Sequence, residues 1–321
     1  MVPKPKPMPR PKQLSFFDFQ RRFPDDQACR EFLIRARWPK GYVCPRCQGQ
    51  RHTYVSTRQH WECKDCRYQV SLIAGTIFQG TRLPLVTWFW AVYLLATQSK
   101  SLSILQLQKD LGIGSYKTAW RITHAIRAAM AQEAREDWLE GLLQLDDAYV
   151  GGEKKGGKTG RGAPGKKAVL ALAQPGAKGR PGKVAFAVGQ QVDSQLVREL
   201  VQRHVRGKVT VVSDALAANR AAATVDGIRH EAVSATADPT GAWAELATVH
   251  RHISNAKRFL VGTHHAIGLQ NAEVFLGEFA WRFNRRYERK APLGLLTRLV
   301  HTPPRPLRSL LGEQGVAAVL R

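Results

Sequence analysis

The sequence predicts an α/β protein in which a sheet domain follows a small cysteine-rich module and a helical region. Three observations lead to this fold class. Two Cys-x2-Cys pairs lie within residues 41–80, apolar helical segments fill residues 83–131, and β-branched runs alternate with helical segments from residue 142 onward. Alternating strands and helices are typical of a sheet covered by helices.

Length and charge narrow the possible classes of protein. The 321 residues suggest about two domains at ~150 residues each. Lys+Arg total 49 and Asp+Glu 25, so the net charge of +24 indicates a polyanionic partner, most simply nucleic acid. The longest apolar run, Leu85 to Thr97, is shorter than the ~20 residues of a membrane span. Residues 1–12 have no apolar stretch typical of a secretory signal, and five cysteines are too few for a disulfide scaffold. We therefore expect a cytoplasmic protein with no membrane contact.

The N-terminal 40 residues divide into two segments. Residues 1–14 alternate Pro with Lys or Arg, which predicts an extended basic arm. Such an arm could contact phosphates or be a disordered tail. Residues 15–40 predict a helical segment, in which Asp25 is the expected N-cap of a helix that ends before Trp38.

Residues 41–80 predict a zinc ribbon. Cys44 and Cys47 form one pair, and after a gap of 15 residues Cys63 and Cys66 form the second. Two-residue spacing lets both thiolates of a pair reach one ion, so two pairs give a closed tetrahedral site. We expect one structural Zn²⁺ that folds the ribbon and does no chemistry, because all four positions are filled. Two disulfides or free thiols are the alternative, which a cytoplasmic chain disfavours.

Residues 81–135 predict a helix-turn-helix region. A helix ending near Leu111, a turn at residues 112–114 and a second helix after Ser115 match this motif in size. On the second helix we expect Tyr116, Lys117 and Arg121 to contact DNA. An ordinary helical connector is the alternative.

Carboxylates interrupt the apolar strands of the sheet domain. Strands are expected near residues 142–150, 167–174, 183–191, 208–213 and 228–233, with helices near 193–205 and 215–224. Asp146 and Asp147 lie in the first strand, and Asp214 ends the fourth. A carboxylate in a buried strand is costly unless it is paired or binds metal. Two carboxylates on neighbouring strands could hold two divalent cations for phosphoryl transfer. Alternatively, Asp214 only caps the following helix.

The ordered set of motifs resembles one family. The motifs are Leu-Asp-Asp-Ala-Tyr-Val-Gly-Gly (145–152), Val-Val-Ser-Asp (211–214), His-Arg-His-Ile-Ser-Asn-Ala-Lys (250–257), Gly-Thr-His-His (262–265) and Phe-Ala-Trp-Arg-Phe-Asn-Arg-Arg (279–286). After a zinc ribbon and a helix-turn-helix, they resemble bacterial insertion-sequence transposases with an ISXO-like catalytic domain. The resemblance implies an RNase H-like fold for residues 138–290, with a mixed five-stranded sheet flanked by helices. Residues 291–321 are then a C-terminal tail.

The resemblance also implies the catalytic residues. Asp146 matches the first catalytic Asp, Asp147 the acidic residue that follows it, and Asp214 the second catalytic Asp. The third position is usually Glu and in some branches Asn, and the matching residue here is Asn255. An Asn carbonyl oxygen can bind Mg²⁺ but adds no charge. Together, Asp146, Asp214 and Asn255 are expected to hold two Mg²⁺ ions, for which Mn²⁺ can substitute.

Basic residues near these motifs are candidates for DNA contact. A Gly/Lys-rich stretch between the first two strands is either a cationic loop along the DNA path or a disordered surface loop. Arginines on one face of the C-terminal helix either contact phosphates or are simply solvated. His250 and His252 are either bystanders or residues along the DNA path. The residues expected to contact the DNA backbone are Lys154, Lys155, Lys158, Arg161, Lys257, Arg258, Arg282, Arg285 and Arg286.

These expectations describe a Mg²⁺-dependent DNA transposase of an insertion sequence. Its partners would be double-stranded DNA, both the terminal inverted repeats of the element and the target, and a second copy in a homodimer or larger assembly. The resemblance places it at the nucleoid in the bacterial cytoplasm. Two alternatives remain open: a catalytically inactive, transposase-derived DNA-binding protein, and a metal-dependent nuclease without strand transfer.

Overall fold

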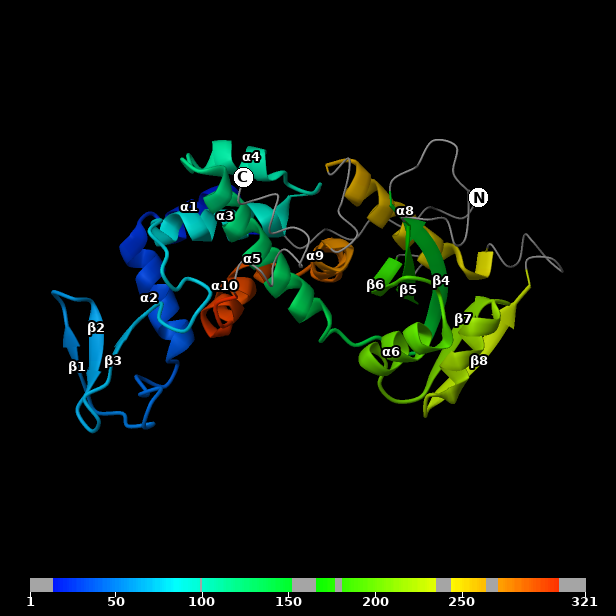
Figure 1. Ribbon diagram of the computed structural model, residues 1–321, viewed down its shortest axis with the longest axis horizontal. Helices are drawn as coiled ribbons and strands as arrows, with labels where there is room; N and C mark the ends of the chain where they lie inside the picture. The colour runs from blue at the N-terminus through cyan, green and yellow to red at the C-terminus, as the bar shows by residue number, and fades with distance from the viewer. Residues whose placement is uncertain are drawn as a thin grey trace, which may run out of the picture. The chain divides into compact units, whose positions relative to one another are not determined.

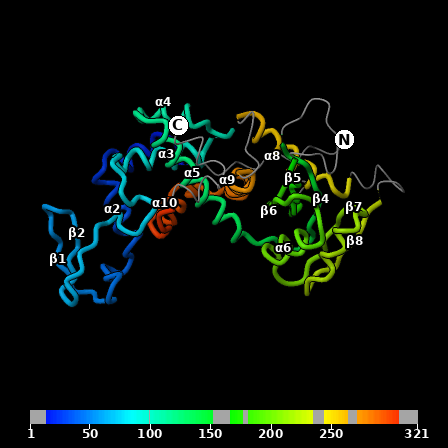
Figure 2. Tube along the Cα trace, viewed as in Figure 1, coloured from blue at the N-terminus to red at the C-terminus, as the bar shows by residue number. Residues whose placement is uncertain are grey.

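The computed structural model of the chain describes residues 14–98, 100–151, 166–176, 181–234, 244–263 and 271–305. These residues divide into two compact units (Figures 1 and 2). The first unit contains residues 14–97, 108–114 and 285–305. The second contains the described residues within 98–107 and 115–284.

Helices and a small antiparallel sheet make up the first unit. The helices are α1 (Phe16–Arg22), α2 (Asp26–Arg37), α3 (Leu85–Thr97) and α10 (Ala291–His301), and the strands are β1 (His52–Val55), β2 (His60–Cys63) and β3 (Gln69–Ser71). Asp25 caps α2, as expected, because its carboxylate accepts a hydrogen bond from the Ala28 N–H at 2.9 Å. The first unit therefore combines a helical cluster with the cysteine-rich ribbon.

The segment that we expected to be a C-terminal tail begins with a helix. α10 contacts α2 and α3. The residues that it buries are mostly apolar: Pro292, Leu293, Leu295, Leu296, Leu299 and Val300. Their spacing gives the helix one apolar face, which is favourable only when another element covers it. The expectation of a tail therefore does not hold for residues 291–301.

A five-stranded mixed sheet forms the centre of the second unit. Its strands are β4 (Leu142–Val150), β5 (Lys167–Pro175), β6 (Pro181–Gly189), β7 (Val209–Asp214) and β8 (Ile228–Val233). In the order β6-β5-β4-β7-β8, the first three pair antiparallel, and β7 and β8 run parallel to β4. The observed sheet, flanked by helices, confirms the predicted fold class.

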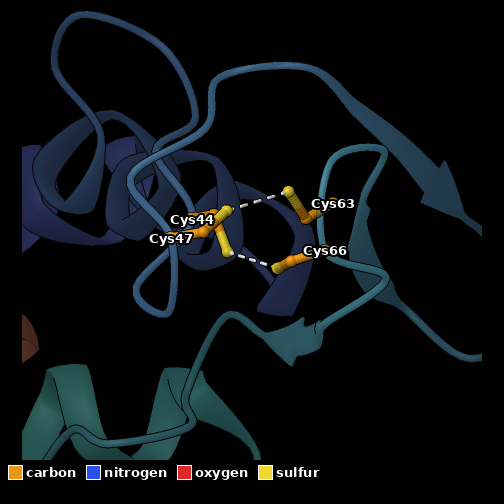
Figure 3. A group of neighbouring side chains, drawn as sticks. All are labelled: Cys44, Cys47, Cys63 and Cys66. Atoms are coloured by element: carbon orange, nitrogen blue, oxygen red, sulfur yellow. Dashed lines mark hydrogen bonds between the residues drawn. The ribbon is translucent and has the colours of Figure 1, made fainter.

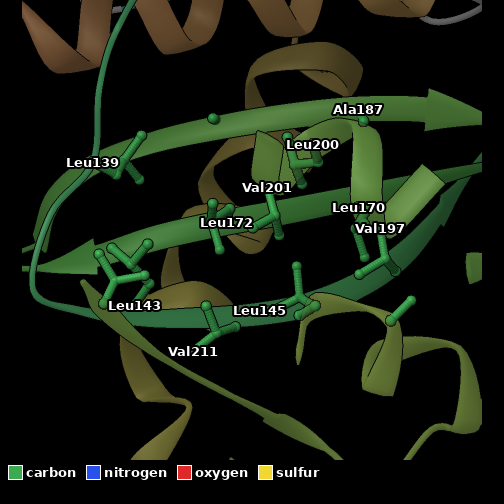
Figure 4. Packing of buried hydrophobic residues seen from close by; sticks show 14 residues of the cluster. Leu139, Leu143, Leu145, Leu170, Leu172, Ala187, Val197, Leu200, Val201 and Val211 are labelled. Carbon is green, nitrogen blue, oxygen red and sulfur yellow. The ribbon is translucent and has the colours of Figure 1, made fainter. Parts of the chain in front are cut away.

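The two faces of β4 have different roles, and the side chains of one face belong to the buried apolar cluster (Figure 4). Leu143 and Leu145 belong to the apolar core that packs against α6 (Ser194–His204). Side chains alternate along a strand, so Gln144 and Asp146 point to the opposite face. There they contact α8 (Ala247–Val261), the helix that also covers β5 and β6. On one face, β4 thus contributes apolar side chains to the core. On the other face, it contributes the polar side chains of Gln144 and Asp146, which contact α8.

α5 (Tyr116–Ala134) is a buried helix of the second unit. Every residue from Ile122 to Ala131 is buried. The helix packs closely on α9 (Ala272–Asn284), where a Cβ atom added at Gly277 would lie 2.4 Å from the Cβ of Ala131. The exposed residues of α5 are Tyr116, Lys117 and Arg121 in its first two turns and Gln132 near its C-terminal end.

A buried ion pair joins α5 to α9. Nε of Arg127 donates to a carboxylate oxygen of Glu278 at 2.7 Å, and both side chains are fully buried. Arg282 donates to the other oxygen of Glu278 at 3.2 Å and to the carbonyl oxygen of Lys100 at 3.0 Å. With its side chain only 8% exposed, Arg282 neutralises a buried carboxylate. Arg282 thus has partners within the protein, and the phosphate contact that we expected for it stays a prediction.

Candidate active site and metal centres

The Sγ atoms of the four ribbon cysteines lie close together (Figure 3). Their Sγ atoms all lie within 4.8 Å of one another, with 3.7 Å between Cys44 and Cys66 and 3.6 Å between Cys47 and Cys63. A tetrahedral Zn²⁺ site with Zn–S bonds of ~2.3 Å requires about 3.8 Å between sulfurs. The four thiolates therefore fit a structural Zn²⁺, as the spacing predicted.

The two cysteine pairs have the same local shape. The N–H of Gln48 donates to the carbonyl oxygen of Cys44 at 2.9 Å, and the N–H of Arg67 donates to that of Cys63 at 3.0 Å. Gln48 and Arg67 both have a left-handed backbone, with φ of 62° and 60°. Burial raises the pKa of the Cys44 thiol, but backbone N–H groups that donate to it outweigh burial and lower the pKa to about 6. The hydrogen bonds at Cys44 therefore favour its thiolate form, which is the form that binds metal.

Three carboxylates form a second cluster, at the sheet of the second unit. One oxygen each from Asp146, Asp147 and Asp214 lie within 4.8 Å of one another, and all three side chains are half-buried. β4 and β7 are parallel neighbours in which Leu145 pairs with Ser213, so Asp146 and Asp214 follow the same rung of the ladder. The register of β4 and β7 thus brings together Asp146 and Asp214, which lie 68 positions apart in the sequence.

Asp214 is held by residues that follow β7. Its Oδ1 accepts a hydrogen bond from Nδ2 of Asn219 at 2.6 Å and from the N–H of Leu216 at 3.3 Å. Asn219 is 1% exposed and lies in η2 (Ala217–Thr224), a 3-10 helix at the place of the helix that we expected. Leu216 is the N-cap residue of η2. Asp214 is therefore more than a helix cap, and Asn219 is a site residue that sequence reasoning missed.

α8 brings His250 to the acidic cluster. Nε2 of His250 lies 3.2 Å from Oδ2 of Asp146. Burial lowers the pKa of His250, while the negative charge of Asp214 acts in the opposite direction. The imidazole of His250 therefore lies beside the acidic cluster, and its place along the DNA path stays a prediction.

Asn255 lies elsewhere on the same helix. An α-helix turns about 100° per residue, so Asn255 is rotated by about 140° from His250. Val249, Ile253 and Ala256 form the buried stripe of α8, and the two residues flank opposite sides of this stripe. Helix geometry therefore directs Asn255 away from the side of α8 on which His250 lies beside Asp146, and its expected role as a metal ligand stays a prediction.

The expected DNA-contacting residues have different surroundings. Tyr116, Lys117 and Arg121 are exposed at the N-terminal end of α5, and Lys257 and Arg258 are exposed on α8. The side chains of Arg285 and Arg286 are half-buried after α9, where the Arg286 guanidinium lies 4.5 Å from the ring centroid of Tyr287. The remaining four cations lie outside the described residues: Lys154, Lys155, Lys158 and Arg161.

Comparison with known proteins identifies both domains. Residues 138–284 match the protein-family model described as an ISXO2-like transposase domain, and residues 24–69 match a transposase zinc-ribbon domain. A protein in the transposable element ISH50 of Halobacterium salinarum is 31% identical over 137 residues, which cover 42% of this chain and 45% of that protein. These findings confirm the resemblance seen in the sequence. No helix among the residues that the structure describes is long and apolar enough to cross a membrane.

Proposed function

Because the chain carries a transposase zinc-ribbon domain and an ISXO2-like transposase domain, we propose that it cleaves and joins DNA at the acidic centre of its mixed sheet. The observation that carries this proposal is the meeting of Asp146, Asp147 and Asp214, contributed by neighbouring parallel strands. The net charge of the whole chain, +24, supports a DNA substrate, because a strongly basic chain attracts a polyanion.

The donor set at this centre suits hard divalent cations. Carboxylate oxygens are the ligands that Mg²⁺ prefers, and Mg²⁺ needs only one or two of them besides water and substrate phosphate. The chemistry that two Mg²⁺ or Mn²⁺ ions supply at such a site is activation of the attacking oxygen and stabilisation of the leaving oxygen. We assign the binding of these ions to Asp146 and Asp214.

His250, rather than Asn255, completes the centre in this proposal. Its Nε2 is already 3.2 Å from Asp146, so the imidazole can orient that carboxylate or bind a cation beside it. Asn219 holds Asp214 from the other side through its hydrogen bond of 2.6 Å. Each catalytic carboxylate therefore has a neighbour that restricts its rotation, which keeps the ligand geometry fixed before substrate binds.

Lys257 extends the centre along α8. It lies seven residues after His250, which is about two turns, so its direction differs from that of His250 by only about 20°. Lys257 is exposed. We therefore assign its ammonium group to a phosphate of the DNA strand that enters the centre, and we assign general backbone contact to Arg258.

Recognition of the element's ends belongs in this proposal to the zinc ribbon and to the exposed end of α5. Tyr116, Lys117 and Arg121 present aromatic and cationic groups there. Two ends must be cut together in transposition, so we propose that a homodimer or a larger assembly forms on the DNA.

Strand cleavage and joining test the function. The full-length protein would be incubated with labelled duplexes that carry the inverted repeats flanking its gene, in Mg²⁺ or in EDTA. We expect nicking at the repeat edge and joining to target DNA in Mg²⁺ alone, and we expect Asp214→Asn to bind the duplex without cleaving it. Nicking without joining would favour the nuclease. Specific binding without nicking in Mg²⁺ or Mn²⁺ would favour the inactive DNA-binding protein.

A further inference from the structure

The side chain of Gln144 contacts the beginning of α8. Gln144 is 6% exposed and lies on β4, two residues before Asp146 and on the same face. Its Oε1 accepts hydrogen bonds from the N–H groups of Thr248 and Val249, both at 2.9 Å. Its Nε2 donates to the carbonyl oxygen of Glu245. One amide side chain thus makes three hydrogen bonds to the entry of the helix.

These contacts replace a cap that α8 lacks. The N-cap residue of α8 is Leu246, which has no side-chain oxygen. The N–H groups at the second and third positions of a helix have no partner within the helix, and a cap side chain normally accepts from them. In α8 those two positions are Thr248 and Val249. The oxygen that accepts from their N–H groups is Oε1 of Gln144, which lies on β4 of the sheet.

The cap has a consequence for the acidic centre. His250 directly follows Val249, whose N–H Gln144 holds, and Asp146 lies two residues after Gln144 on β4. We infer that Gln144 is a positioning residue that fixes the first turn of α8 against β4 and thereby holds His250 at Asp146. The capping contacts of Gln144 are present in the structure whatever the function of the protein is. Their effect on metal binding rests on the proposed function.

Two substitutions separate the cap from the bulk of the side chain. Gln144→Met keeps a similar length but can accept no strong hydrogen bond, while Gln144→Glu retains an oxygen for both N–H groups. Val201→Ala is a matched stability control, because Val201 is fully buried in α6 on the opposite face of the sheet. Asp214→Asn is the reference for loss of the metal centre.

The full-length variants would be measured in two ways, by hydrogen exchange over residues 244–256 and by calorimetric titration with Mn²⁺ without DNA. In Gln144→Met we expect amide exchange in the first turn of α8 to rise about tenfold or more, and Mn²⁺ affinity to fall by about the same factor. Val201→Ala should bind Mn²⁺ within about threefold of the wild-type affinity. Gln144→Glu keeps an oxygen for Thr248 and Val249 but loses the donor to the Glu245 carbonyl, so exchange in the first turn of α8 should rise less than in Gln144→Met.

Three results would count against this inference. Unchanged exchange in Gln144→Met would overturn the cap. Faster exchange with unchanged Mn²⁺ affinity, or an equal loss of affinity in Val201→Ala, would overturn the positioning role. If the wild-type protein bound Mn²⁺ no better than Asp214→Asn, the proposed metal centre itself would fail, and the exchange rates would still decide whether Gln144 caps α8.

Discussion

The zinc ribbon and the acidic centre assemble their ligands in opposite ways. In the ribbon, each cysteine pair is a local turn, and Cys44 and Cys63 hold equivalent positions in turns of the same shape. In the sheet, Asp146 and Asp214 meet because two parallel strands are in register, and His250 arrives on a helix from a third part of the chain. Local spacing along the chain determines the positions of the zinc ligands within each cysteine pair. Tertiary packing determines the positions of the side chains in the acidic centre.

This difference explains which sites can be identified from sequence. Backbone geometry within four residues decides the direction of both thiolates in a Cys-x2-Cys pair, so the pattern alone specifies the ligands. For a residue on a helix packed against a sheet, a change of one position rotates the side chain by about 100°. A motif on such a helix therefore does not by itself specify which of its residues reaches the site.

The largest effect is expected from breaking the ribbon site. Replacement of one of four thiolates, as in Cys63→Ser, should abolish stable zinc binding, because structural Zn²⁺ contributes ~10–16 kcal/mol in zinc-finger peptides. Metal analysis and circular dichroism after dialysis would measure the loss. Cys29→Ala is the control, since burial raises the pKa of the Cys29 thiol to about 12 and this thiol lies outside the cluster. Zinc retained at one ion per chain in Cys63→Ser would contradict the assignment.

Breaking the acidic centre should abolish chemistry without unfolding the chain. Asp146→Asn or Asp214→Asn removes a charged metal ligand, and we expect cleavage to fall by about 10³-fold or more with DNA affinity little changed. Asp193→Asn is a matched control, because Asp193 caps α6 and Asn is an equally good cap. Equal losses of binding and cleavage would argue against a catalytic role.

The free energy of unfolding should depend on the buried ion pair between Arg127 and Glu278 in the second unit. In Glu278→Gln, Arg127 loses its charged partner at 2.7 Å in a fully buried position, at a cost of about 3–5 kcal/mol of unfolding free energy. Glu273→Gln on the same helix removes only an exposed pair with Arg135 and should cost less than ~1 kcal/mol. Urea titration would measure both, and similar midpoints for the two variants would show that the buried pair contributes little.

Two α8 variants test which residue of this helix acts at the acidic centre. His250→Ala should lower Mg²⁺-dependent cleavage by about 10²-fold, since it removes the imidazole beside Asp146. Asn255→Ala should change cleavage by less than about threefold, because this side chain lies on the other flank of the helix. Single-turnover cleavage of the inverted-repeat duplex would measure both rates, and the reverse order would restore Asn255 as the third residue.

Much of the fold could be predicted from the sequence, and the reason is physical. Each of the five strands lies within two residues of its expected range, because short, largely apolar or alternating runs bounded by turn residues are typical of strands. Asp25 was identified as a cap from residue type and spacing alone. Arg282 was not predictable in this way, because its role depends on Glu278 and on a carbonyl group 182 residues away. The roles of Gln144 and Asn219 likewise depend on partners that only the folded sheet supplies.

We propose that Asp146, Asp214 and His250 together form the metal centre. Anomalous scattering from crystals of the full-length protein soaked in Mn²⁺ would test it most directly. The account predicts Mn²⁺ peaks at about 2.0–2.3 Å from carboxylate oxygens of Asp146 and Asp214, with the His250 imidazole beside them and Asn255 remote. A Mn²⁺ ion bound through the Asn255 side chain, or no Mn²⁺ at these carboxylates, would contradict it.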